Sequence, residues 1–119
     1  MPGPGKALRV LFIPAAQRDV QKAVTYYHKE GGPALVDRFE AEVSRCTALA
    51  ARTPLASPVV SSGASLQAHC KVLGNHFPYS LFFVVDDETL MVLSVAHHKR
   101  RSAFWASRLR GLRKGPPRP

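Results

Sequence analysis

The sequence predicts an α+β fold: a small, mainly antiparallel four-stranded sheet with an N-terminal helical hairpin packed on one face. Two apolar runs, Tyr79–Val85 and Leu90–Ala96, are too short for ordinary helices and are joined by the acidic turn Asp86–Thr89, a pattern typical of a β-hairpin. Upstream, apolar residues recur at helical spacing in two consecutive stretches. Because the helical patterns come early and the strand patterns late, we expect the order β-α-α-β-β-β with a short C-terminal helix.

The first half of the chain predicts one strand and two helices. The strand is expected over Lys6–Ile13, and Pro14 can occupy the first turn of a helix over Ala15–Lys29. The turn Glu30-Gly31-Gly32 ends that helix, and Pro33 begins the second, so the two form an antiparallel hairpin. The buried stripes comprise Ala16, Val20, Ala23, Val24 and Tyr27 in the first helix, and Leu35, Phe39, Val43, Cys46 and Ala50 in the second. The outer face of the second helix is expected to carry Asp37, Arg38, Glu40 and Glu42.

The second half predicts the rest of the sheet. A loop over Leu55–Ser65 leads to a third strand over Leu66–Leu73, and Gly74-Asn75 turns the chain into the hairpin. Alternation places Ala68, Cys70 and Val72 on one face of the third strand and Gln67, His69 and Lys71 on the other. The first hairpin strand has no polar face, so we expect it to be central. Phe82 and Phe83 then lie on opposite faces, with at least one buried against the helical hairpin.

The charge of the chain is strongly basic and unevenly placed. Seventeen Lys and Arg against eight Asp and Glu give a net charge of +9, and no acid follows Glu88. This asymmetry favours a polyanionic partner, either nucleic acid or an acidic protein segment, although a solvated basic tail is an equal alternative. The 119 residues are expected to form one domain spanning 1–119, with loose termini at 1–5 and 115–119.

Cysteine usage and hydropathy indicate a soluble, cytoplasmic protein. Cys46 and Cys70 lie inside apolar patterns and are expected to be buried thiols rather than a disulfide framework. The stretch LRVLFIPAA loosely imitates a signal-peptide core, but it is short, is interrupted by Arg9 and leads into an amphipathic helix. No apolar run approaches membrane-spanning length, so no membrane partner is expected.

Several stretches, taken in their order and spacing, carry a family resemblance over roughly Arg9 to Arg108. They are Ile13-Pro14-Ala15-Ala16 with Asp19-Val20 and Tyr26-Tyr27, then Leu49 followed by Pro54, then Phe77-Pro78-Tyr79, Val95-Ala96-His97-His98-Lys99-Arg100, Trp105 and Arg108. Together they resemble the RelE/ParE superfamily, the toxins of bacterial type II toxin–antitoxin pairs. The chain departs from the family pattern at Lys71, where Arg is common, at His98 in place of Gly, and at Arg101-Ser102 in place of an acid and Pro.

The resemblance implies two possible targets. The closing motif is closer to the ParE-like, plasmid-stabilisation branch, which implies a toxin that binds DNA gyrase without catalysis and is neutralised by a cognate acidic antitoxin. The alternative is a ribosome-associated mRNA endoribonuclease of the RelE kind, using Lys71, His97 and Arg100; no Tyr follows Tyr79, which weakens that reading. A non-toxic basic nucleic-acid-binding module is a third possibility. No reading calls for a small-molecule cofactor.

Each candidate site residue also has a structural interpretation. His97 could act as general acid in RNA cleavage, but a structural histidine at the sheet rim is favoured. Arg100 and Lys71 could clamp a phosphate, or Arg100 could pair with a buried acid and hold the C-terminal segment. Trp105, with Phe104, could stack on a base, although a core role is favoured.

The remaining candidates concern binding. A surface for the target or for nucleic acid is expected from Lys99, Arg101, Trp105 and Arg108. A metal site is not expected, because His69, Cys70, His76, His97 and His98 offer no recognised zinc spacing.

Overall fold

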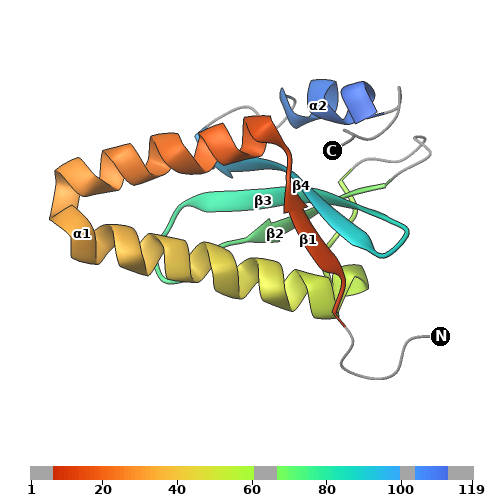
Figure 1. Cartoon of the computed structure of the whole chain (residues 1–119), viewed down its shortest axis with the longest axis horizontal. Helices are drawn as coiled ribbons and strands as arrows, with labels where there is room; N and C mark the ends of the chain where they lie inside the picture. Colours follow the sequence, from red (N-terminus) through yellow and green to blue (C-terminus); the bar gives the residue numbers. More distant parts are fainter. Residues whose placement is uncertain (1–6, 61–66, 100–103, 113–119) are drawn as a thin grey trace.

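The computed structural model describes residues 7–60, 67–99 and 104–112. The elements in chain order are β1 (Arg9–Phe12), α1 (Pro14–Arg52), a 3₁₀ turn (Pro54–Ala56), β2 (Ala68–Val72), β3 (Tyr79–Asp86), β4 (Thr89–His97) and α2 (Phe104–Leu112). The four strands form one sheet in the order β1-β4-β3-β2, in which β1 runs parallel to β4 and the other pairs are antiparallel (Figure 1). The predicted α+β class is confirmed.

The helical hairpin is a single element, α1, folded back on itself at one glycine. Gly32 has φ of 71° and breaks the helix, so residues 14–31 form a first arm and residues 33–52 a second arm that runs back beside it (Figure 1). Only glycine enters this region of φ without steric cost. The predicted antiparallel hairpin is confirmed, and its turn is narrower than the three-residue turn that the sequence suggested.

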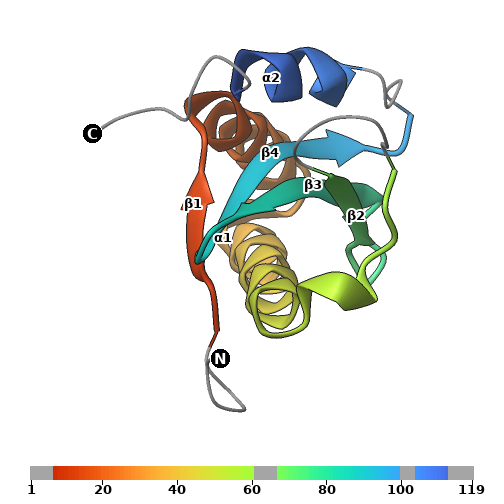
Figure 2. The same cartoon turned by 90° about the vertical axis from the view of Figure 1, so that its right-hand side faces the viewer.

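Both arms cover one face of the sheet, and an aromatic cluster joins the two layers (Figure 2). Tyr27 from the first arm and Phe39 from the second meet Phe77 and Tyr79, with ring centroids between 5.1 and 6.0 Å apart. Mixed edge-to-face and tilted geometry is the favourable arrangement for such rings, because edges carry positive and faces negative charge. The predicted stripes therefore meet the sheet through large rings.

The hairpin of β3 and β4 is the centre of the sheet, as predicted. β3 lies between β4 and β2, and Phe82 and Phe83 are 6% and 0% exposed. The β3–β4 pairing passes from Phe82–Ser94 to Phe83–Val92, so Leu93 is an extra residue in β4. Such a bulge changes which backbone groups of the longer strand face outward.

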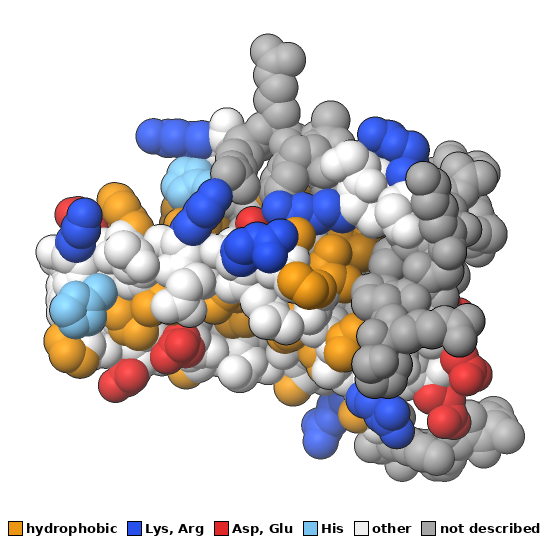
Figure 3. All heavy atoms as spheres, turned by 45° about the horizontal axis from the view of Figure 1, so that its top comes forward, with side chains coloured by type: hydrophobic (Ala, Val, Ile, Leu, Met, Phe, Trp, Pro, Cys, Tyr) orange, Lys and Arg blue, Asp and Glu red, His pale blue; other side chains and the backbone are white. Residues whose placement is uncertain are grey.

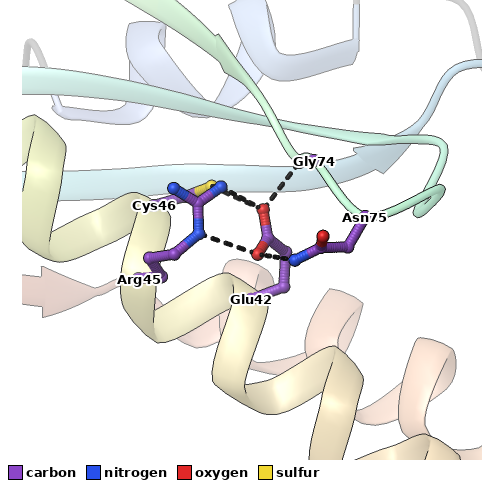
Figure 4. Close-up of polar contacts among 5 residues, drawn as sticks. All are labelled: Glu42, Arg45, Cys46, Gly74 and Asn75. Carbon is purple, nitrogen blue, oxygen red and sulfur yellow. Dashed lines mark hydrogen bonds and ion pairs between the residues drawn. The ribbon is translucent and has the colours of Figure 1, made fainter.

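Glu42, expected on the solvent face of the second arm, is only 2% exposed, so that expectation is wrong. Its carboxylate accepts hydrogen bonds from the Gly74 N–H at 2.6 Å and the Asn75 side-chain amide at 2.8 Å, in the turn between β2 and β3 (Figure 4). Arg45 adds a charged partner with Nη2 2.6 Å from a carboxylate oxygen. Burial of this acid is possible because these three neighbours and the Cys46 thiol, which donates to Oε2 at 3.4 Å, satisfy it.

The expected alternation along β2 is also incomplete. His69, assigned to the polar face, is 5% exposed, since Nδ1 lies 2.9 Å from the Ser57 carbonyl oxygen and the ring stacks on Phe83. Val72, assigned to the apolar face, is 58% exposed. β2 lies at the edge of the sheet. The burial of a side chain there depends on which neighbouring segment covers it, and not only on the face of the sheet to which it points.

Candidate functional site

β4 is longer than the strand beside it, which leaves part of its edge open. β1 pairs only with Thr89–Val92, and the ladder ends where the Ile13 N–H donates to the Val92 carbonyl oxygen at 3.1 Å. Beyond this point the backbone of β4 needs other partners, since unpaired buried groups are costly. Two side chains supply them: the Val95 N–H donates to Asp19 Oδ2 at 3.0 Å, and Arg108 Nη1 donates to the Leu93 carbonyl oxygen at 2.8 Å.

Asp19 and Arg108 also bind each other. Arg108 Nη1 lies 2.6 Å from Asp19 Oδ2 and Nη2 lies 3.2 Å from Oδ1, and the two side chains are 4% and 18% exposed. This two-bond geometry is the strong form of an Arg–carboxylate pair. The pair fastens three elements that are distant in the sequence: the first arm, the edge of β4 and α2. We call it the Asp19–Arg108 latch.

The latch fixes α2 beside the first arm and the end of β4 (Figures 1 and 2). Leu109, the next residue of α2, is 5% exposed and belongs to the core. Arg110 follows and is exposed, as is Lys99 just after β4. Arg110 is thus presented by a helix that the latch and the apolar contacts of Leu109 and Ala106 hold in place, and Lys99 is presented by the end of β4.

His97 ends β4 and is partly buried. Its ring packs edge-to-face on Tyr79 at 5.1 Å, and the Lys99 N–H donates to its Nδ1 at 3.0 Å. Burial, followed by the nearby charges of Lys99 and His98, lowers the pKa of His97 below its ordinary value. Because Nδ1 is an acceptor here, the proton of the neutral ring is on Nε2. Protonation would break the bond to Lys99, so the environment opposes the cationic form that a general acid needs.

A small pocket opens between the first arm and the end of β4. It has a volume of about 250 Å³, with Tyr79 and His97 on the sheet side and Lys22 and Tyr26 on the helix side. Tyr26 is 54% exposed at its mouth. Asp19 lines the same pocket, but its carboxylate is already engaged in the latch. The pocket can therefore receive an anionic or aromatic group from outside.

The structure separates two residues of the predicted catalytic set. Lys71 pairs with Leu81, which in turn pairs with Val95 on β4, so the backbone of Lys71 lies two strands away from β4, roughly 10 Å at ordinary strand spacing. Leu81 and Tyr79, both buried, lie on the strand between. Arg100, the third member of the set, lies outside the described residues, as does Arg101.

The predicted binding residues differ in how exposed their side chains are. Lys99 is exposed beside His97, whereas most of the Arg108 guanidinium is enclosed by the latch. Trp105 and Phe104 lie in α2, but their side chains are outside what the structure describes. The sequence analysis gave Arg100 an alternative role, which was to pair with a buried acid and hold the C-terminal segment. In the structure Arg108 has this role through its pair with Asp19.

Sequence reasoning missed Asp19 as a site residue. Its position carried a signal, because Asp19 falls on the apolar stripe between Ala16 and Ala23 at helical spacing, where a charge is out of place. A buried acid at such a position requires a cationic or N–H partner elsewhere in the chain.

The face shared by the first arm and α2 is cationic. Figure 3 shows Lys and Arg side chains gathering across the middle of this face; a small acidic area is visible between them, and the other Asp and Glu side chains lie lower and toward the sides. Arg18 and Lys22 from the first arm are both exposed, in addition to Lys99 and Arg110. A polyanionic partner would be attracted to this face.

Within residues 7–60, 67–99 and 104–112, no group of three or more His, Cys, Asp or Glu side chains is placed to hold a metal ion. None of the described helices is long and apolar enough to cross a membrane.

Comparison with known proteins identifies the family. A search of curated sequences found no match. A solved structure described as the chromosomal ParDE toxin–antitoxin system from P. aeruginosa is similar in fold, with a TM-score of 0.62 and 13% sequence identity; the match covers 76% of this chain and 96% of that one. The family model for the ParE toxin of the type II toxin–antitoxin system, parDE, matches residues 10–102. The chain therefore belongs to the ParE toxin family of type II toxin–antitoxin systems.

Proposed function

We propose that this chain is a cytoplasmic toxin that acts by binding DNA gyrase and is neutralised by a cognate acidic antitoxin. The family match over residues 10–102 carries the proposal, because it covers the strands, the helical hairpin and the basic end of β4. Toxin–antitoxin pairing is the property by which the family is described. Gyrase as the target comes from the resemblance to the ParE-like branch.

The geometry around His97 supports binding over catalysis. Cleavage of RNA needs a proton donor or acceptor placed against the scissile phosphate together with groups that stabilise its charge. Lys71 is two strands away, and the neutral state of His97 is favoured by burial and by the Lys99 N–H. A protein that acts by binding needs only a well-placed surface, and the latch holds such a surface in position.

A ribonuclease of the RelE kind is the second candidate, and the pocket beside His97 is the observation that favours it. His97 Nε2–H and the Lys22 ammonium line the same pocket and could donate to one phosphate. For this mechanism His97 would serve as a hydrogen-bond donor or, after protonation, as an acid.

Toxicity of single variants separates the two functions. We expect His97→Gln to remain toxic when expressed without antitoxin, because no single titratable group is indispensable to a binder. His28→Gln, an exposed histidine on the first arm, is the matched control. Loss of a general acid would instead lower a cleavage rate by about 10²–10⁴. Rapid mRNA cleavage in a translating extract, abolished by His97→Gln but not by His28→Gln, would replace the gyrase proposal with the ribonuclease.

The basic surface can be tested separately. Removal of residues 100–113 should abolish toxicity, but it also removes Arg108. The double variant Lys99→Gln/Arg110→Gln changes two exposed side chains and leaves the latch intact. We expect it to weaken toxicity, and cells expressing the unaltered chain should show DNA-damage signalling before translation falls. Early arrest of translation without DNA damage would contradict gyrase as the target.

Co-purification tests the antitoxin. The protein encoded by the adjacent reading frame should be acidic and should be recovered with this chain after co-expression. Association should slow as salt is raised, with a smaller effect on the stability of the complex, because long-range attraction acts mainly on the encounter. Recovery of the chain without its neighbour would count against the pairing.

A further inference from the structure

The turn between β2 and β3 is strained at an exposed position. Asn75 and His76 have φ of 57° and 67°, and the Phe77 N–H donates to the Gly74 carbonyl oxygen at 3.2 Å, which closes a four-residue turn. Positive φ at both central residues is the type I′ pattern, for which Asn-Gly is the preferred pair. Asn tolerates this region, whereas His76 is held in a conformation that its side chain disfavours. Such strain persists only where surrounding contacts enforce it.

Glu42 enforces the turn from below (Figure 4). Its carboxylate binds the Gly74 N–H and the Asn75 amide, and it also accepts from Arg45 Nε at 2.9 Å and Nη2 at 2.6 Å. A Cβ on residue 74 would lie 3.1 Å from Glu42 Oε2, so glycine allows this close approach. The hydrogen bonds from Arg45 are the main reason that the pKa of Glu42 falls to about 2. The acid is thus ionised and fully paired, and the turn is fixed to the second arm.

A groove of about 420 Å³ lies between this turn and the second arm, and two arginine side chains line it. Ala41, His76 and Phe77 also line it, together with Glu42 and Asn75, which are hydrogen-bonded to each other beneath the turn. Arg45 is 52% exposed and its Nη1 makes no hydrogen bond to the described residues; Arg38 is exposed and has neither a hydrogen bond nor an ion pair among them. Donors on a rigid rim that lack internal partners are available to an external anion.

We infer that this groove is a docking surface for an acidic peptide segment of a partner protein. Arg38 and Arg45 are seven residues apart on one helix face, roughly 10 Å along the axis. Carboxylates seven residues apart on a partner helix match that spacing. Ala41 and Phe77 suit an aliphatic side chain between the two acids, whereas Phe77, 5% exposed, offers little ring surface on which a nucleobase could stack. The pre-formed turn lowers the ordering cost of binding.

The inference rests on the proposed function, since an acidic antitoxin would supply the segment. A direct test measures binding by fluorescence anisotropy at low salt, with a labelled alanine-based helical peptide carrying two glutamates seven residues apart and a leucine between them. The control peptide carries glutamine in place of both. We expect Arg38→Glu to weaken binding of the glutamate peptide by about tenfold, given what exposed charge pairs contribute. Arg52→Glu, an exposed arginine at the end of the second arm with the same change in net charge, should alter it less than about twofold.

His76→Gly separates binding from stability. Glycine relieves the positive φ, so the melting temperature should rise, while loss of the imidazole should weaken peptide binding by about threefold. Equal weakening by Arg38→Glu and Arg52→Glu, or equal affinity for the two peptides, would overturn the inference. So would a short single-stranded oligonucleotide whose binding depends on Arg38 while peptide binding does not.

The purified protein of the adjacent reading frame then distinguishes the two proposals. If the unaltered chain does not bind it, the antitoxin pairing fails whatever the peptide does. If the chain binds it and Arg38→Glu binds it equally well, only the docking groove is wrong.

Discussion

Replacing Asp19 with Asn should destabilise the protein more than any change at the exposed positions of the first arm. The carboxylate accepts three N–H groups, from Val95 and from both terminal nitrogens of Arg108. An amide presents one acceptor oxygen and puts an NH₂ group against a donor. It also leaves the Arg108 guanidinium, 18% exposed, without its counter-charge. Breaking a buried pair in this way costs about 3–5 kcal/mol, which partial exposure of Arg108 reduces to about 2–4 kcal/mol.

A cost of this size is a large share of the stability of a small domain, about 5–15 kcal/mol, and corresponds to a fall in Tm of roughly 10 °C. Urea unfolding of Asp19→Asn, Arg108→Met and the double variant measures it as a thermodynamic cycle. Arg108→Met keeps much of the side-chain volume and removes the charge, so the double variant should be less destabilised than the sum of the single changes by about 1–3 kcal/mol. Arg18→Gln should change stability by less than about 0.5 kcal/mol. Additivity within about 0.5 kcal/mol would refute the latch as a coupled unit.

Two further predictions concern the other buried groups. Phe83→Ala should cost about 3–5 kcal/mol in urea unfolding, because Phe83 is fully buried in the central strand, and a near-unchanged Tm would show that the core does not depend on β3. Glu42 has its pKa lowered from 4.5 to about 2, chiefly by hydrogen bonds from Arg45, so it stabilises the folded state by about 3 kcal/mol above pH 4.5 and loses that contribution as the pH falls toward 2. Glu42→Gln should remove most of that acid-dependent loss, and an unaltered pH profile of stability between pH 5 and 2 would contradict the assignment.

The helices and the β-hairpin were predictable because each follows from a pattern of neighbouring residues. The two arms of α1 follow from apolar residues at helical spacing, and the hairpin of β3 and β4 follows from two short apolar runs around an acidic turn. The Gly31-Gly32 pair marked the reversal, and Gly32 is where the helix breaks. In each case the residues that carry the sequence pattern are the same residues, or close neighbours of those, that form the element.

The polar contacts were not predictable in the same way, because their partners are distant in sequence. Asp19 meets Val95 and Arg108, 76 and 89 residues away, and Glu42 meets Gly74, 32 residues away. Periodicity identifies which face of a helix is buried. A charged side chain at the margin of that face can nevertheless be buried if another element supplies hydrogen-bond or ionic partners for it. Glu42 was assigned to solvent for this reason, whereas Asp19 lay on the apolar stripe itself and could have been recognised.

The candidate catalytic set stays a prediction, and the structure adds only the separation of two of its members. A basic run after β4 suggested that Lys71, His97 and Arg100 might converge on one phosphate. Strand order separates the backbone of Lys71 from that of His97, because β3 lies between β2 and β4. The sequence predicted that the first hairpin strand is central and that the strand of Lys71 leads into it, so this separation could have been inferred from the sequence. The arginine that pairs with Asp19 is Arg108, in the middle of α2, and its neighbours in the sequence do not distinguish it.

Burial of Asp19 and Glu42 also changes how the net charge is presented. All eight acids lie within the described residues, and these two are turned inward and paired with arginine. The other six fall in two groups: Glu30, Asp37 and Glu40 near the reversal of α1 and along the second arm, and Asp86, Asp87 and Glu88 at the β3–β4 turn. Neither group lies beside the end of β4, where Lys99 is exposed. In the first arm Asp19 is buried and Glu30 lies at the reversal, so a partner that approaches the face formed by the first arm and α2 meets mainly cations. The local field there is stronger than an even distribution of the net charge of +9 would give. Association at this face should accelerate as ionic strength falls, and Lys99→Gln/Arg110→Gln should reduce that acceleration while leaving the dissociation rate almost unchanged.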